Sequence, residues 1–253
     1  MALFQSSNPA LNEKIFSRNM DQSNLGVMTV RGSLNKFGFL MFMVMAGAFY
    51  TWHLYVTQPS TMMTLLWVGM IGGLISGLVI AFKPNLAQYL APAYGILEGF
   101  VLGAISAILN DAFREKYPNI ILQAVGLTLA VAFAMFLLYN FRIIRATQKF
   151  KSIIITATMG IAIFYLITMV LNLFHVNMPF MYDSSPLGIG ISLFIVGIAA
   201  MNLILDFDMI ERGAEMGAPK FMEWYGAFGL LVTIVWLYIE ILRLLSRFAG
   251  SKR

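Results

Sequence analysis

Seven apolar runs of membrane-spanning length dominate this chain. A helix crosses the hydrocarbon core of a bilayer with roughly 20 apolar residues. The predicted spans are Phe37–Val56, Met62–Phe82, Leu90–Leu109, Ile120–Tyr139, Ser152–Phe174, Leu187–Phe207 and Phe221–Leu245. The connections are short and leave no room for a separate soluble domain. The sequence therefore predicts an all-α membrane protein: a polar N-terminal segment (1–36), a seven-transmembrane-helix bundle (37–248) and a basic tail (249–253).

Composition agrees with this class. The chain is 59% hydrophobic and 11% charged, whereas about a quarter of the residues of a soluble domain are charged. There is no cysteine, which excludes disulfides and thiolate metal sites. His53 and His175 lack ligand-like spacing. No cofactor, firm metal site or nucleic-acid partner is therefore expected, and the oligomeric state is left open.

Basic residues predict the orientation of the bundle. The loops between the spans alternate between the two sides of the membrane. On one of these sides, the only Lys and Arg before the C-terminal tail are Arg114 and Lys116. Lys and Arg gather on the cytoplasmic side of membrane proteins. We therefore expect the N-terminus in the cytoplasm. Seven full crossings put the basic tail outside, whereas a last helix that crosses only in part would return it inside; the sequence leaves both open, and we favour seven crossings. The side predicted as cytoplasmic carries Lys14, Arg18, Arg31, Lys36, Lys83, Arg142, Arg145, Lys149, Lys151, Arg212 and Lys220.

Small residues recur every fourth position in the second and third spans. Such ladders let helix backbones approach closely in lipid, so the two spans are expected to pack tightly together. The second span carries Gly69, Gly73 and Gly77, and the third carries Ala91, Gly95, Gly99, Gly103 and Ala107.

Among the charged residues within or at the edge of the spans, we single out Glu98, Asp206, Glu240 and Arg243. A charge near the bilayer centre costs roughly 2.5–3.5 kcal/mol on insertion scales. Glu240 and Arg243 are three residues apart and could form a structural ion pair. Three acids against one base predict that some carboxyls are protonated or hydrated, as in a proton-sensitive switch or a cation site.

The acids near residue 206 separate into two groups by helical spacing. Asp206 follows Asn202 by four residues, so both share one face, which we expect to look into the bundle. Asp208, Glu211 and Glu215 form a second stripe, expected to be solvated at the cytoplasmic mouth. The alternative is that Asp206 and Asp208 are ordinary interfacial acids at a helix end.

Several segments resemble the Bax inhibitor family, the transmembrane Bax-inhibitor-motif proteins, in its bacterial YccA-like branch. "LILDFDMIERG" followed by "LLVTIVWLYIEILRLLSRF" is similar to the last two helices of the family. "YGILEGFVLGAIS" resembles its third helix, and "NPAL" and "MTVRGSLNKFGFL" resemble a bacterial N-terminus. The resemblance covers nearly the whole chain, and the ordered set of segments is more specific than any one of them.

The resemblance implies a seven-helix bundle around a central last helix in a bacterial cytoplasmic membrane. It implies a pH-sensitive calcium leak, or modulation of a membrane AAA protease. The pH latch of the family would correspond to Asp206 and Glu240, with transient calcium possible there. This chain departs from the pattern in having Glu at 240 instead of Asp, a long loop before the last helix, and Lys83 at the end of the second span instead of an Arg inside it.

Two functions follow as hypotheses. The first is a calcium or cation leak channel gated by protonation of a buried carboxylate pair. The alternative is a non-transporting regulator that binds another membrane protein, such as an AAA protease, through the polar N-terminus. An enzyme is not expected, because the chain has no GxGD, HExxH, P-loop or GxSxG motif.

Overall fold

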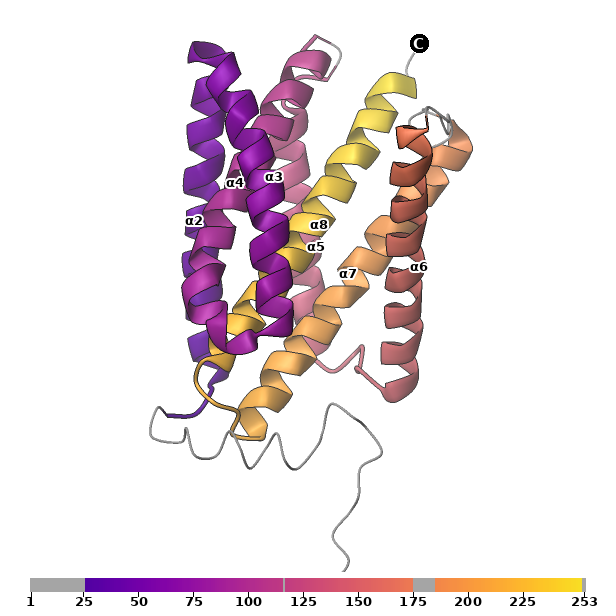
Figure 1. Ribbon diagram of the computed structural model, residues 1–253. Coiled ribbons are helices and arrows are strands. Elements are labelled where there is room, and N and C mark those ends of the chain that lie inside the picture. The colour runs from indigo at the N-terminus through magenta and orange to yellow at the C-terminus, as the bar shows by residue number, and fades with distance from the viewer. Residues whose placement is uncertain (1–25, 116, 175–184, 252–253) are drawn as a thin grey trace, which may run out of the picture.

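The computed structural model describes residues 26–115, 117–174 and 185–251, and in these ranges the chain is a bundle of long helices (Figure 1). Seven of them are long and apolar enough to cross a membrane, which confirms the predicted all-α membrane bundle. A short 3₁₀ turn, η2 (Pro84–Leu86), precedes α4. The long helices are α2 (Val30–Thr57), α3 (Pro59–Phe82), α4 (Ala87–Phe113), α5 (Ile120–Asn140), α6 (Gln148–Leu173), α7 (Pro186–Glu215) and α8 (Met222–Ser251).

Polar caps explain why several helices begin outside the apolar runs. Thr29, Thr147 and Ser185 each accept a backbone N–H of the first turn through their side-chain oxygen, which satisfies a donor that the helix leaves free. Pro59 and Pro186 occupy first-turn positions that need no N–H. The polar segment was expected to continue to residue 36, but α2 already begins at Val30.

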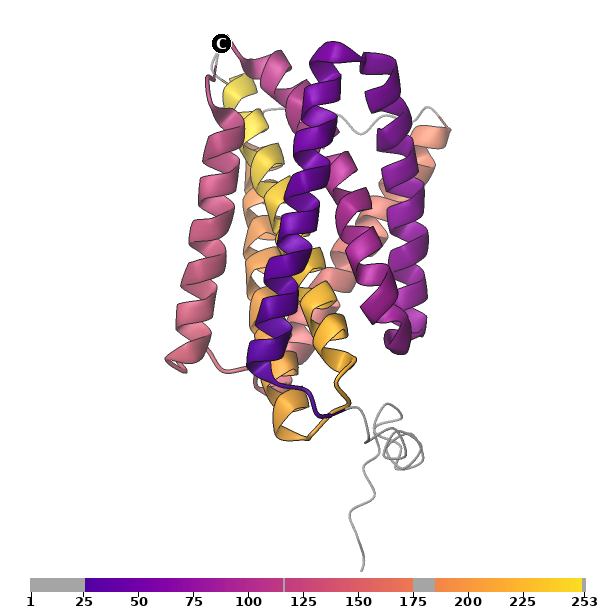
Figure 2. The same cartoon turned by 90° about the vertical axis from the view of Figure 1, so that its left-hand side faces the viewer.

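The last helix, α8, occupies the centre of the bundle. It packs against α2, α4, α5 and α7, and Figures 1 and 2 show it running through the middle of the molecule. Its Leu230, Leu231, Leu237 and Leu242 are fully buried. The central last helix implied by the family resemblance is therefore present.

Helices α3, α5 and α6 lie at the periphery and expose apolar side chains such as Leu74, Phe133 and Leu166. Exposed apolar surface of this extent suits contact with lipid. Helix α6 packs chiefly on α7, at one edge of the view in Figure 1.

The small residues of α4 bring its backbone close to α2. The predicted contact of α4 with α3 is also present, but fewer of these small residues take part in it. A Cβ at Gly47 of α2 would lie 2.6 Å from the carbonyl oxygen of Ile96, and one at Gly69 of α3 would lie 2.6 Å from that of Leu97. The Gly99 and Gly103 positions of α4 press on the backbone of α2. The second and third spans, α3 and α4, do pack together as predicted. The small residues of α4, however, mainly contact the first span, α2.

The start of α2 and the end of α8 lie at opposite ends of the bundle (Figure 1). We call the end at which α2 begins the N-terminal end. The α5–α6 and α7–α8 connections lie at the same end. An odd number of crossings therefore separates the two termini of the described bundle, as the sequence predicts.

Candidate functional site

Asp206 sits in α7 with its carboxyl group against α8. It lies beside Thr233, and a Cβ at Gly229 would be 3.8 Å from its Oδ1 atom. Its Oδ2 atom is buried and has no hydrogen-bond partner within the described part of the chain. A buried polar atom without a partner costs about 1–3 kcal/mol, so this carboxyl is a candidate for protonation or for binding water or a cation. It faces the interior, as its helical position predicts.

Asn202 does not support Asp206, although the two residues are one turn apart. Its Nδ2 atom donates to Thr158 Oγ1 on α6 at 2.8 Å and to the carbonyl oxygen of Ile198 at 2.9 Å. Asn202 therefore fixes the contact between α6 and α7, while Asp206 looks toward α8.

Glu98 lies midway along α4, at the wall of an open cavity of about 640 Å³. The cavity is lined by α3, α4 and α8. A Cβ at Gly73 of α3 would be 3.4 Å from Glu98 Oε2. The Glu98 carboxyl interacts with the Tyr94 hydroxyl, and the Tyr94 ring packs edge-on against Phe228 at 4.9 Å between centroids. No Lys or Arg of the described ranges forms an ion pair with Glu98.

Gly229 connects the two acids. It lines the cavity beside Glu98, and a Cβ added to it would lie 3.8 Å from Oδ1 of Asp206. Gly229 therefore belongs to the cavity lining and also lies near the Asp206 carboxyl, with no side chain of its own at that position. Sequence spacing could not reveal this relation, since it depends on how three helices pack.

Glu240 belongs to a separate, neutralised group further along α8. It is 1% exposed and accepts hydrogen bonds from Tyr165 Oη at 2.8 Å, Trp236 Nε1 at 3.2 Å and Arg243 Nη1 at 3.0 Å. Arg243 also bonds to the Tyr165 hydroxyl and lies 5.2 Å from the centre of its ring. The structural ion pair between Glu240 and Arg243 considered in the sequence is therefore present.

The acidic stripe at the N-terminal end of the bundle is only partly solvated. Asp208 is 6% exposed, is paired with Lys151, and accepts from Arg212 Nε at 2.8 Å. The expectation that Asp208 begins a solvated stripe is wrong, because the start of α6 covers it and supplies Lys151. Glu215 is exposed, as expected.

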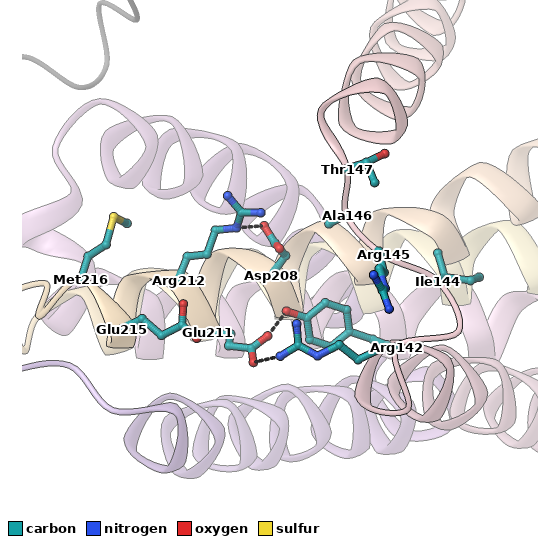
Figure 3. A pocket seen from close by; sticks show the side chains of 11 residues that line it. Arg142, Ile144, Arg145, Ala146, Thr147, Asp208, Glu211, Arg212, Glu215 and Met216 are labelled. Atoms are coloured by element: carbon teal, nitrogen blue, oxygen red, sulfur yellow. Dashed lines mark hydrogen bonds and ion pairs between the residues drawn. The ribbon is translucent and has the colours of Figure 1, made fainter. Parts of the chain in front are cut away.

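Glu211 joins the same stripe to the end of α5. It accepts from the Tyr139 hydroxyl and from Arg142 Nη2, the latter at 3.2 Å (Figure 3). The three acids do share one face, and that face contacts the α5–α6 connection.

A polar clamp at the start of α2 was missed in the sequence. The buried Glu223 of α8 accepts from the Thr29 backbone N–H and from its hydroxyl, both at 3.0 Å, and pairs with Lys36. Met28 N donates to the carbonyl oxygen of Ala218 at 2.7 Å. These partners are nearly 200 residues apart along the chain, so no local pattern could have indicated them.

A comparison of the sequence with protein-family models places this chain in a family. The family model described as Bax inhibitor 1 like matches residues 8–250. The chain belongs to the Bax inhibitor 1 like family. A search of curated proteins finds no match. The YccA-like branch stays a prediction.

In this Bax inhibitor 1 like protein, Asp206 and Glu240 do not form the contact implied by the resemblance. Asp206 lies at Gly229, and Glu240 follows Gly229 by eleven residues along one continuous helix, a distance of about 16 Å at 1.5 Å per residue. Glu240 is instead held by the partners described above. The expected latch contact is therefore wrong here, because the rise of α8 carries Glu240 past the level of Asp206.

Among the described residues of this Bax inhibitor 1 like chain, no Lys or Arg lines the cavity beside Glu98. Lys83 caps the end of α3 and is exposed, whereas Gly73 and Gly77 of the same helix line the cavity beside Glu98. The acids near the cavity are therefore Glu98 and Asp206.

Proposed function

We propose that this protein is a pH-sensitive cation leak channel in which Asp206 and Glu98 flank the pathway. The observation that carries the proposal is the buried Asp206 carboxyl, whose Oδ2 atom has no hydrogen-bond partner among the described residues and which lies near Gly229, a residue of the cavity that Glu98 also lines. Intramembrane carboxyl groups that lack a cationic partner are typical of ion and proton pathways.

Calcium is the cation that we favour. Carboxylate oxygens are hard ligands that suit it, and the hydroxyl groups of Tyr94 and Thr233 and the carbonyl group of Gly229 supply further oxygens near the two acids. Binding would be transient, since a channel site must release the ion as well as attract it.

Protonation sets the direction of the pH dependence. A neutral Asp206 can stay buried without a partner, whereas an ionised Asp206 must recruit water or a cation. Ionised acids therefore favour cation entry, and protonated acids oppose it. We expect the flux to rise as the pH rises.

Calcium influx into liposomes that contain the purified protein tests the proposal between about pH 5 and pH 8, where carboxyl groups in buried sites titrate. We expect more influx at the upper end, and a lower and flatter profile for Asp206→Asn. The variant Glu115→Gln removes an exposed acid outside the bundle interior and is the matched control. Influx that ignores pH and survives Asp206→Asn would refute the mechanism.

A non-transporting regulator is the second candidate, and the clamp at Glu223 favours it. The clamp ties the chain that follows the N-terminal segment to the central helix. A membrane partner, such as an AAA protease, that pulled on this segment would thereby act on α8.

Deletion of residues 2–25 separates the two candidates, because it spares the clamp. A non-transporting regulator should lose its effect on the partner and should show no calcium influx either before or after the deletion. A channel should keep its pH-dependent influx. We place the protein in a bacterial cytoplasmic membrane with its N-terminus in the cytoplasm, as supported by the basic residues at the N-terminal end of the bundle.

A further inference from the structure

A second cavity, of about 460 Å³, lies at the N-terminal end of the bundle. It is bounded by the α5–α6 connection on one side and by the last turns of α7 on the other (Figure 3). Its apolar lining includes Ile144, Ala146 and Met216. The volume falls within the range of about 300–1,000 Å³ typical of small-molecule sites.

The charged lining of this cavity is largely paired within the protein. Arg142 binds Glu211 through Nη2, and Arg212 binds Asp208 through Nε. Each of these guanidinium groups has further N–H donors, because a guanidinium carries five.

One cation and one anion of the lining are uncommitted. Within the described ranges, no hydrogen bond or ion pair involves the side chains of Arg145 and Glu215, and both residues are exposed. Arg145 comes from the α5–α6 connection beside Ile144, and Glu215 comes from the end of α7 beside Met216 (Figure 3). The cavity therefore offers opposite free charges from its two walls.

We propose that this cavity binds the headgroup of a zwitterionic phospholipid that carries a primary ammonium group, an aminoethyl phosphate. The phosphate would lie on Arg145, with the spare donors of Arg142 and Arg212 beside it, because planar guanidinium groups suit phosphate oxygens. The ammonium would donate to Glu215. A ligand that carries only a phosphate would place its negative charge near the carboxylate of Glu215. A ligand that carries only an ammonium would place its positive charge near the guanidinium of Arg145.

The position of the cavity favours a lipid as the source of this group. It lies where α5 ends and beside the last turns of α7, at the N-terminal end of the bundle. Lipid headgroups lie next to the ends of membrane-spanning helices. Phe141 and Ile143 of the same connection are 67% and 68% exposed. They give acyl chains an apolar surface beside the charged lining.

Titration of the detergent-solubilised full chain with short-chain lipids tests the proposal. We expect phosphatidylethanolamine to bind about tenfold more tightly than phosphatidylcholine, whose quaternary ammonium has no N–H to donate to Glu215, and than phosphatidylglycerol, which has no ammonium at all. Free phosphoethanolamine should compete only at much higher concentration. If free phosphoethanolamine competes at the same concentration as the lipid, the ligand of this cavity is not a lipid.

Two variants assign the ends of the ligand. Arg145→Gln should weaken the binding of both phosphatidylethanolamine and phosphatidylglycerol about tenfold. Glu215→Gln should weaken the binding of phosphatidylethanolamine only. Lys149→Gln and Glu115→Gln are matched controls outside the lining and should change neither. Equal affinity for all three lipids, tighter binding of phosphatidylglycerol than of phosphatidylethanolamine, or unchanged affinity in both lining variants would overturn the proposal.

Discussion

At the scale of single residues, the charges inside this bundle differ in what neutralises them. Glu240 has Arg243, Tyr165 and Trp236 around its carboxylate. Asp206 has an orphaned Oδ2. A buried charge with a complete set of partners stabilises one arrangement, whereas one without them is free to respond to protons or ions. This difference favours a structural role for Glu240 and is consistent with the role that we propose for Asp206.

Removing the partner of Glu240 should destabilise the fold. In Arg243→Gln the nearly fully buried Glu240 loses its cation, at a cost of about 3 kcal/mol. The double variant Glu240→Gln with Arg243→Gln should recover part of that loss. Thermal unfolding in detergent checks both, with the exposed Arg114→Gln as the control. Equal stability of Arg243→Gln and the control would contradict the structural role.

At the scale of helices, close backbone contact between α2 and α4 depends on positions that tolerate no side chain. The Cβ that Gly99→Ala adds would press on the carbonyl oxygen of Val44. A Cβ added at Gly160 of α6 would have no neighbouring atom within 4 Å. The two glycines therefore form a matched pair for testing the packing.

Gly99→Ala should lower stability by about 2 kcal/mol through overpacking. Gly160→Ala should leave stability unchanged or raise it by up to about 1 kcal/mol, because alanine is the better helix former. Thermal unfolding of the two variants under identical conditions measures the difference. If both lower stability equally, the close contact between α2 and α4 is not the reason for the effect.

The clamp between α2 and α8 makes a second prediction at this scale. Lys36→Met removes the cation from the buried Glu223, so the start of α2 should open more often. We expect the amide of Met28, which donates to Ala218, to exchange hydrogen roughly tenfold faster. Arg31→Gln, an exposed change on the same helix, should leave that exchange rate unaltered. Unchanged exchange in Lys36→Met would mean that the ion pair does not hold the clamp.

At the scale of the whole molecule, the spans could be predicted from the sequence because bilayer thickness sets the length of each apolar run. The pairing of Glu240 with Arg243 could be predicted because it depends only on helical spacing. The burial of Asp208 by Lys151 could not, and neither could the relation of Glu98 to Asp206 across Gly229. Both relations depend on which helices pack against each other, and the spacing of residues within one helix does not show this.

The pH response also belongs to this scale, since it involves three helices and the cavity between them. Loss of either Glu98 or Asp206 should reduce the rise of calcium influx with pH, because each acid supplies charge to the same pathway. Glu240→Gln acts on a carboxylate that Arg243 already neutralises. It should leave the shape of the pH profile intact if the protein folds, as judged by its elution as a single species in detergent.

The most direct test of the central claim is calcium influx into liposomes at pH 8 for Glu98→Gln, Asp206→Asn and the double variant. Residues that act on one pathway give non-additive effects. We therefore predict that each single variant lowers the influx and that the double variant loses no more than the more severe single variant. Influx at the unaltered level in either single variant, or losses that multiply in the double variant, would contradict a shared pathway between Glu98 and Asp206.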